Sequence, residues 1–181
     1  VDIMGGDYAT EATVLGSVLA RKDLSDDVDL VLFGDQDRIN ETVAREGLDL
    51  SGFTVFHTPH SVEMNDNPAR VFSEKPDSGI ARGLRMLREG KLDGFASVGN
   101  TGAMLVGAIQ IVNPIQGVIR PSLATSIPND RGNPTVLLDI GLNADSRPDV
   151  LYQFGIFGSI YAEHVHNIKE TKVGLLNIGK E

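Results

Sequence analysis

Apolar and polar positions follow two different periods along this chain. Short apolar runs rich in Val, Ile, Leu and Phe, such as Val28–Phe33, have the length and composition of strands. Between them lie segments whose apolar residues recur at helical spacing, such as Ile80, Leu84 and Leu87. The pattern predicts strands at residues 28–33, 53–57, 94–98, 123–127, 135–140 and 173–178. It predicts helices at residues 36–46, 78–89, 101–112 and 150–165.

The order of these elements predicts an α/β fold. Strands that alternate with helices are typical of a mostly parallel sheet with helices on both faces. The strands at 123–127 and 135–140 are an exception, because the segment between them, Pro128–Pro134, is too short for a helical crossover. We expect this pair to form an antiparallel hairpin or an excursion at the edge of the sheet.

A long polar loop, residues 58–77, follows the strand predicted before it. It contains Pro59, Pro68 and Pro76, and a short helix is expected near Pro68–Phe72. Loops of this length inside a compact domain often carry function. We therefore interpret the loop as a candidate lid over a site.

The composition fits one globular domain. The chain has 181 residues, of which 41% are hydrophobic and 23% charged, and this length supports a sizeable core. Val1 already lies in an apolar run with no initiator Met, and the chain stops at Glu181 directly after a strand-like run. We expect residues 1–181 to be a single α/β domain that forms the N-terminal part of a longer protein.

The net charge of −9 and the absence of cysteine exclude several classes of function. A general nucleic-acid binder needs a basic face, so we expect no nucleic-acid partner, and any anionic substrate requires a local site. Disulfides, thiolate metal sites and cysteine nucleophiles are excluded within this stretch, and a cytosolic location is compatible with that. Residues 102–119 carry no charge, but Asn113, Pro114 and Gly117 interrupt them, which favours a buried helix and a loop over a membrane span.

The most promising candidate site is the turn Ser97–Ala103, which lies at the carboxyl end of a predicted strand, where open parallel sheets bind ligands. Gly99 and Gly102 allow close approach of the backbone to a ligand. Asn100 or Thr101 can cap the following helix and leave amide N–H groups facing an anion. An ordinary capped helix explains the same residues equally well. The string matches neither GxGxxG nor the P-loop, so it does not predict nucleotide binding.

A second candidate lies at the end of the strand predicted at 135–140. Asp139, Asn143 and Asp145 crowd this point. They fit a metal site, groups that orient a nucleophile, or caps of the next helix. Because a metal needs more convergent ligands than the sequence shows, we favour a polar wall of an active site or turn chemistry.

A third candidate is the MGGD turn, Met4–Asp7, which follows the first apolar run. Gly5 and Gly6 suit a turn that needs positive φ. Asp7 or Thr10 can cap the next helix. Taken alone, this string favours a simple turn.

A fourth candidate is the segment Lys75–Gly79. Asp77 or Ser78 is a good N-cap, and capping is the simpler interpretation. The alternative is a helix N-terminus at which Lys75 or Arg82 helps to hold phosphate. Among the histidines, His57 follows a strand and is a candidate to face the cleft, and no HExxH metal motif occurs.

Together these strings resemble one protein family. MGGD at 4–7, VGNTGA at 98–103 and LLDIGLNAD at 137–145 occur in the order typical of the bacterial phosphate acyltransferases known as PlsX, and LYQFGIFGSIYAEHVHNI and KVGLLNIG follow them. The resemblance covers nearly the whole chain. Two positions depart from it, since Ile3 stands where the family usually has Ala and Lys180 where it usually has Glu.

The resemblance implies a three-layer α/β/α Rossmann-like fold with a mostly parallel sheet, like that of isocitrate/isopropylmalate dehydrogenase. It implies a reaction in which acyl carrier protein thioester and inorganic phosphate give acyl phosphate for phospholipid synthesis. It further implies that no metal or nucleotide cofactor is needed. Family members are homodimers that associate peripherally with the cytoplasmic membrane, so a cytoplasmic location is expected.

For this reaction we predict catalytic roles for Asn100, Asn143 and Asp145. The first would bind phosphate or the oxyanion, and the other two would orient groups on the opposite wall. The predicted substrate-binding residues lie at strand ends or helix starts, and they are Gly99, Thr101, Gly102, Asp7, His57, Lys75 and Ser78. One helix carries a basic set that suits either docking of the acidic carrier protein or an ordinary solvated face, namely Arg82, Arg85 and Arg88.

Three alternatives remain open from the sequence. One is a phosphotransacetylase-type enzyme that uses a coenzyme A thioester as donor. Another is an NAD(P)-linked decarboxylating dehydrogenase on the same fold, which the lack of a dinucleotide fingerprint disfavours. The third is a non-catalytic module that binds a small anion. The donor preference separates the first from the acyltransferase, and a cofactor-dependent absorbance change separates the second. Bound phosphate without turnover would favour the third.

Overall fold

The computed structural model describes residues 1–130, 132–141, 143 and 145–176. The chain divides into two compact units, Val1–Asn113 and Pro114–Glu181. Our expectation of a single domain over residues 1–181 stays a prediction.

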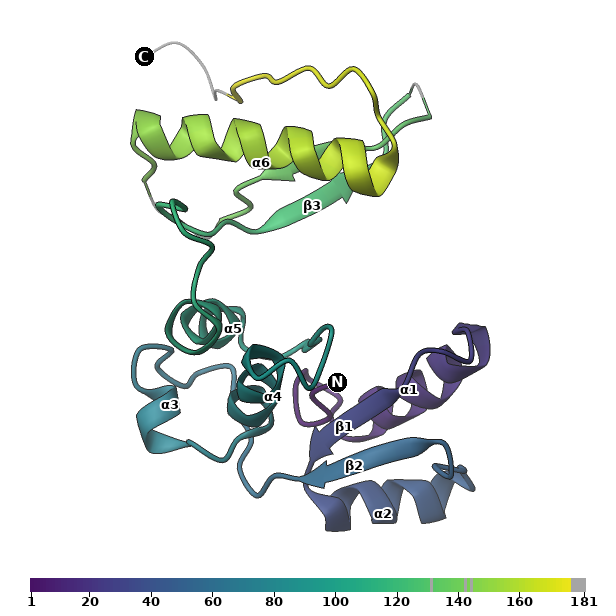
Figure 1. The fold of residues 1–181 in the computed structure, drawn as a ribbon. Coiled ribbons are helices and arrows are strands. Elements are labelled where there is room, and N and C mark those ends of the chain that lie inside the picture. The colour runs from purple at the N-terminus through teal and green to yellow at the C-terminus, as the bar shows by residue number, and fades with distance from the viewer. Residues whose placement is uncertain (131, 142, 144, 177–181) are drawn as a thin grey trace. The chain divides into compact units, whose positions relative to one another are not determined.

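The first unit contains most of the helices (Figure 1). Its elements are α1 (Glu11–Asp23), β1 (Leu30–Gly34), α2 (Gln36–Glu46), β2 (Phe53–His57), α3 (Val71–Glu74), α4 (Gly79–Arg88), α5 (Thr101–Gly107) and the π-helix η1 (Ala108–Val112). The second unit contains β3 (Ala124–Ile127), β4 (Thr135–Leu138) and α6 (Pro148–His166). The α/β class is confirmed. Helix 101–112 is also confirmed, although its last part widens from α to π geometry.

A parallel pair of strands forms the centre of the first unit. β1 pairs with β2 in parallel, with Leu30 opposite Phe53 and Gly34 opposite His57. The chain start extends this sheet, because the Ile3 N–H donates to the Phe33 carbonyl at 2.9 Å. The carboxyl ends of β1 and β2 and the segment that follows Ile3 therefore meet at one edge, as expected for ligand sites in parallel sheets.

The strand predicted at 94–98 is wrong as a regular strand. Residues 94–97 form no strand ladder. The Asp2 N–H donates to the Ala96 carbonyl at 2.8 Å, and the Ser97 hydroxyl donates to the Asp2 side chain at 2.7 Å. The backbone bends at Val98 and Gly99, so too few residues remain aligned to form a ladder.

The strand predicted at 173–178 is absent from its described part. Residues 171–176 form no regular structure, and residues 177 and 178 lie outside the described residues. A strand needs a neighbour for its backbone groups, and the described residues supply none here. Leu175 and Leu176 are accordingly 76% and 83% exposed.

Helices cover both faces of the parallel pair. Successive strand residues point to opposite faces. Leu32 packs in a buried cluster with Val14 of α1 and Ile39 of α2. Phe33 points the other way, where its Cβ would lie 3.5 Å from a Cβ built on Gly79 at the start of α4. The predicted covering of the sheet on both sides is thus confirmed for this unit.

A second apolar cluster joins the long loop to α4 and α5. Val62 and Val71 from the loop region pack with Leu84 of α4 and Ala103 of α5. The contact is close at Gly107, where an added Cβ would lie only 2.3 Å from Leu84 Cδ1. The loop is therefore part of the core of this unit and not a detached lid.

The second unit is a hairpin covered by one long helix (Figure 1). β3 and β4 pair antiparallel, with Ala124 opposite Leu138, so the predicted hairpin is confirmed. Gly158 of α6 packs against Leu138, since an added Cβ would lie 3.0 Å from its Cδ1. Among the residues the structure describes, no helix combines the length and apolarity needed to cross a membrane.

Candidate active site

A buried carboxylate, Asp2, joins two of the predicted site turns. Its side chain belongs to a residue that is 4% exposed. The Met4 N–H of the MGGD turn donates to Asp2 Oδ1 at 3.1 Å, and the Ser97 hydroxyl donates to Asp2 Oδ2 at 2.7 Å. The Gly99 N–H in turn donates to Ser97 Oγ at 3.0 Å. One carboxylate thus holds the backbone of both turns, directly in one and through a serine in the other.

Glycines make this close packing possible. A Cβ on Gly5 would lie 2.8 Å from both Asp2 Oδ2 and the Gly99 nitrogen. A Cβ on Gly79 would lie 2.9 Å from Asp2 Oδ1. Gly6 has a φ of 92°, which confirms the positive-φ turn predicted for MGGD. The turns after residue 3 and residue 97 and the start of α4 therefore converge on the Asp2 side chain.

Burial raises the pKa of the Asp2 carboxyl, while the hydrogen bonds from Ser97 and Met4 act in the opposite direction. No lysine or arginine of the described residues forms an ion pair with Asp2. Its pKa is therefore raised by desolvation and lowered by the Ser97 and Met4 donors and by the charge of the Val1 amino group.

Asn100 caps α5 and also holds the long loop. The Ala103 N–H donates to Asn100 Oδ1 at 2.9 Å, so of the two predicted cap residues, Asn100 and Thr101, the cap is Asn100. Asn100 Nδ2 lies 3.1 Å from the Glu63 carbonyl and 3.2 Å from the carbonyls of Met64 and Asp66. The residue is 5% exposed, and every polar atom of its side chain is engaged. Its predicted contact with substrate stays a prediction, and its observed contacts are those of a positioning group.

Thr101 and Gly102 supply the backbone donors of this turn. They occupy the first two positions of α5, whose N–H groups have no acceptor within the helix. No hydrogen bond from either N–H to a described residue is present. Thr101 is exposed, and Gly102 packs against the loop, since an added Cβ would lie 2.6 Å from Pro68 Cγ. The predicted anion donors thus lie beside the predicted lid.

Lys75 stabilises the same loop from its other end. Its Nζ donates to the Ser61 carbonyl at 2.9 Å and to Asp66 Oδ2 at 2.5 Å. The hydrogen bond from Lys75 lowers the pKa of the Asp66 carboxyl. The predicted role of Lys75 in phosphate binding is untested, and its ammonium group is committed to the loop in this structure.

The remaining first-unit candidates have separate surroundings. His57 is exposed at the end of β2, and its Nδ1 accepts at 3.1 Å from the N–H of Gln36, the first residue of α2. Ser78 is fully buried and caps α4 by accepting from the Ala81 N–H at 3.4 Å. Asp7 is exposed, and the N-cap position of α1 is Thr10.

Asn143, one of the two predicted wall residues of the second unit, is held by Asp139. Asp139 Oδ2 accepts from the Asn143 backbone N–H at 2.7 Å and from Asn143 Nδ2 at 2.9 Å. Arg120 donates to Asn143 Oδ1 at 3.4 Å. Asp145 is exposed. Because these residues belong to the second unit, their predicted place opposite Asn100 stays a prediction.

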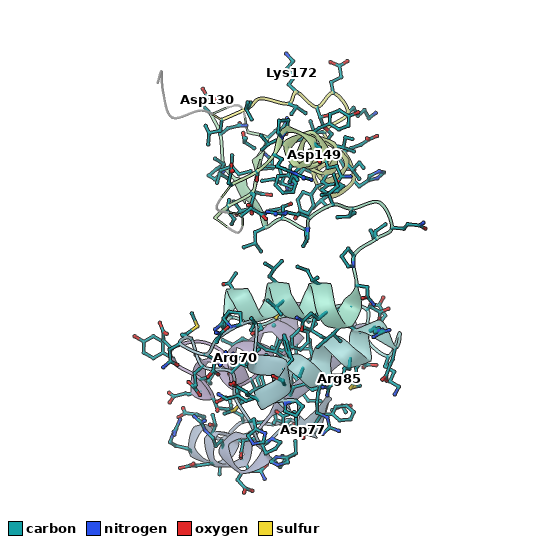
Figure 2. The ribbon with its side chains drawn as sticks, turned by 90° about the vertical axis from the view of Figure 1, so that its left-hand side faces the viewer. Arg70, Asp77, Arg85, Asp130, Asp149 and Lys172 are labelled. Atoms are coloured by element: carbon teal, nitrogen blue, oxygen red, sulfur yellow. The ribbon has the colours of Figure 1, made fainter. Side chains whose placement is uncertain are left out.

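Two of the three arginines of α4 form hydrogen bonds to backbone carbonyls within the first unit. Arg82 donates to the His57 carbonyl at 3.3 Å. Arg85, labelled in Figure 2, donates to the Pro76 carbonyl at 2.7 Å. A surface hollow of about 460 Å³ lies beside this helix, lined by Arg85, Arg88, Glu89, Gln110 and Ile111.

Over the described ranges, no group of three or more acidic or histidine side chains is placed to hold a metal ion.

Sequence reasoning missed Asp2 and Ser97 as site residues. The available signal was an isolated acid in the apolar run that ends at Met4. A carboxylate at an inward position of a buried strand needs donors, and Ser97 is the side-chain donor that the fold supplies.

The fold and the site define the class of the first unit: an α/β unit whose glycine-rich turns gather at the carboxyl edge of a parallel sheet. The family model described as fatty acid synthesis protein matches residues 1–181, and the chain belongs to this family.

Curated relatives agree with this membership. A phosphate acyltransferase of Dictyoglomus turgidum is 38% identical over 181 residues, which is 100% of this chain and 53% of that protein. Phosphate acyltransferases of Bacillus cytotoxicus and Thermoanaerobacterium thermosaccharolyticum are 37% and 40% identical over 181 residues, covering 100% of this chain and 53% and 52% of those proteins. The chain therefore spans about half the length of the curated relatives it matches.

Proposed function

We propose that the full-length protein carrying this chain is a phosphate acyltransferase, which converts the thioester of acyl carrier protein and inorganic phosphate to acyl phosphate in phospholipid synthesis. One observation carries the proposal: the whole chain matches a family of fatty acid synthesis proteins, and its curated relatives are named phosphate acyltransferases. The glycine-rich turns at the sheet edge support it as a place for a small anion.

In the proposed reaction, a phosphate oxygen attacks the thioester carbonyl carbon. A C–O bond forms, the C–S bond breaks, and the electron pair leaves on the sulfur of the carrier protein, which takes up a proton. Because a thiolate leaves readily, no covalent enzyme intermediate is required. Positioning phosphate against the carbonyl and stabilising the oxyanion of the tetrahedral intermediate are then the two tasks of the site.

For the first task we propose the turn Gly99–Gly102. The N–H groups of Thr101 and Gly102 are the donors offered to phosphate or to the oxyanion. Asn100 keeps a place in the site as the group that holds these donors and the loop together. Lys75 and Ser78 are proposed as neighbouring support on the loop and at the start of α4.

The remaining residues enter the proposal as outer groups. Asp7 and His57 lie at the carboxyl edge of the sheet and face solvent. Asn143 and Asp145 are proposed to orient the substrate from the second unit. Asn143 is itself fixed by Asp139, as an orienting group should be.

The finer features implied by the family resemblance are proposed with the function. They are a three-layer Rossmann-like fold of the isocitrate/isopropylmalate dehydrogenase type for the complete protein, a homodimer, and a cytoplasmic location with peripheral contact to the membrane. The parallel pairing of β1 and β2 and the helices on both faces of β1 support the fold proposal.

The direct test is acyl phosphate formation by the full-length protein. Acyl carrier protein thioester and inorganic phosphate are supplied, and the product is trapped with hydroxylamine as the hydroxamate and quantified. A parallel reaction with the coenzyme A thioester measures the donor preference. We expect phosphate-dependent product from the carrier thioester. Product from coenzyme A alone, or binding of phosphate without turnover of either donor, would contradict the proposal.

A further inference from the structure

The Asp2 carboxylate lies at the convergence of three segments that are distant in sequence. The MGGD turn bonds to it through the Met4 N–H, and the turn at residue 97 bonds to it through the Ser97 hydroxyl. The start of α4 abuts Oδ1, the oxygen that accepts from the Met4 N–H, at Gly79. Burying a carboxylate costs free energy, and Asp2 is only 4% exposed, so the carboxylate needs the hydrogen bonds from Met4 and Ser97.

Ser97 connects this carboxylate to the proposed anion-binding turn. Its hydroxyl donates to Asp2 and accepts from the Gly99 N–H at the same time. The Gly99 N–H is therefore turned inward, toward the serine, while the N–H groups of Thr101 and Gly102 stay without a partner among the described residues. The orientation of the donors in the turn thus depends on the Asp2–Ser97 bond.

The two turns also touch directly above the carboxylate. A Cβ on Gly99 would lie 3.2 Å from Gly5 Cα, and a Cβ on Gly6 would lie 2.9 Å from Val98 Cγ2. Neither turn can move closer to the other without a steric clash.

We propose that Asp2, acting through Ser97, is a positioning residue for the anion site: it locks the MGGD turn and the turn Gly99–Gly102 into one frame that fixes the donors for phosphate. This inference rests on the proposed function, and it predicts that loss of the Asp2–Ser97 bond loosens both turns together and weakens binding of phosphate more than it slows turnover.

The test uses Ser97→Ala and Asp2→Asn in the full-length protein, with Ser17→Ala as the matched control. Ser17 is also a poorly exposed serine with one hydrogen bond, to the Thr13 carbonyl at 2.8 Å, but it lies in α1 away from both turns. Ser97→Ala removes the link without adding volume. Asp2→Asn keeps the shape and removes the charge, and Ser97→Ala decides the question if the aspartate variant does not fold.

Two measurements are made on each variant. Steady-state kinetics of acyl phosphate formation give the KM for phosphate, which we expect to rise about tenfold in Ser97→Ala, with a far smaller change in kcat, as for loss of a hydrogen bond to a charged group. Hydrogen–deuterium exchange is expected to accelerate in residues 4–7 as well as in 98–102. Ser17→Ala should change neither measurement.

The outcomes separate this inference from the proposed function. An unchanged KM for phosphate in Ser97→Ala, or faster exchange confined to residues 98–102, overturns the positioning role. If the wild-type protein forms no acyl phosphate, the proposed function fails, and the exchange experiment still decides whether the two turns form one frame.

Discussion

Asn100 Nδ2 lies 3.2 Å from the Asp66 carbonyl, so the residue that caps α5 also holds the long loop 58–77. The same nitrogen meets two further carbonyls of that loop, and Oδ1 serves the cap. This relationship makes the loop and the start of α5 a single structural element, and it leads to the first prediction.

Replacing Asn100 with Ala should lower the free energy of unfolding by about 2–3 kcal/mol. The cap alone is worth about 1 kcal/mol, and loss of the hydrogen bonds from Nδ2 to the loop carbonyls, which belong to exposed or half-buried residues, costs about 1 kcal/mol or more in addition. Urea unfolding of the full-length protein measures the change. Asn40→Ala is the control, because Asn40 is exposed and has a single side-chain bond, from Gln36.

Asn100→Asp separates the two functions of this side chain. The carboxylate keeps an acceptor for the Ala103 N–H but places negative charge against three carbonyls in place of a donor. We expect the Asn100→Asp variant to be less stable than the wild type although the cap is retained. Stability equal to that of the wild type would show that the loop contacts contribute nothing.

The Lys75–Asp66 pair should stabilise the protein in a pH-dependent way. The pKa of Asp66 is lowered in the folded state, chiefly by the hydrogen bond from Lys75. The stabilisation is therefore present above the usual pKa of an aspartate, about 3.9, and is lost as the pH falls through the lowered value. Lys75→Met should cost stability at neutral pH, and the difference from the wild type should shrink in acid.

The difference in stability between Lys75→Met and the wild type will not vanish completely in acid, because Lys75 also donates to the Ser61 carbonyl. Urea unfolding at neutral pH and near pH 3 measures both values. Lys91→Met is the matched control, since Lys91 pairs with Glu89 on the exposed surface and its loss should matter less. A pH-independent difference for Lys75→Met would contradict the role of the ion pair.

Much of the fold follows from local sequence signals. The helix at 36–46 starts where Asp35 accepts from two backbone N–H groups and ends at Gly47 with a φ of 62°, both of which are readable signals. The hairpin of β3 and β4 followed from the shortness of the connection. The strand predicted at 94–98 was wrong because the backbone bends after Ser97 and because its neighbour in the fold, Asp2, lies more than ninety residues away in sequence.

The site was predictable only in part, for the same reason. The cap of α5 is a local pattern, which the sequence narrowed to Asn100 or Thr101, and the structure shows that it is Asn100. Its loop partners lie 34 to 37 residues earlier, beyond the range of any spacing rule. Asp2 looked like one position of an apolar strand, and only the fold shows that Ser97 meets it.

Replacing glycine with alanine should lower the free energy of unfolding at Gly5 and raise it at Gly16. Gly5→Ala places a methyl group 2.8 Å from Asp2 Oδ2 and from the Gly99 nitrogen, so the turns must separate. We expect a loss of about 1–3 kcal/mol, as for overpacking. Gly16 lies within α1 and has no atom within 4 Å of an added Cβ, so Gly16→Ala should gain about 0.5–1 kcal/mol. Thermal unfolding of both variants tests this, and equal shifts would contradict the close packing at Gly5.

The buried carboxyl of Asp2 should give the opposite pH dependence to that of Asp66. Burial raises the pKa of Asp2 in the folded state, so the folded protein holds this proton more tightly than the unfolded chain. Its ionisation therefore costs stability as the pH rises from about 3.9, the usual value, through the raised pKa. Asp2→Asn cannot ionise, so the wild type should lose stability relative to this variant as the pH rises across that window. Urea unfolding at intervals between pH 4 and neutrality measures the difference, and a constant difference would show that Asp2 keeps an ordinary pKa in the folded protein.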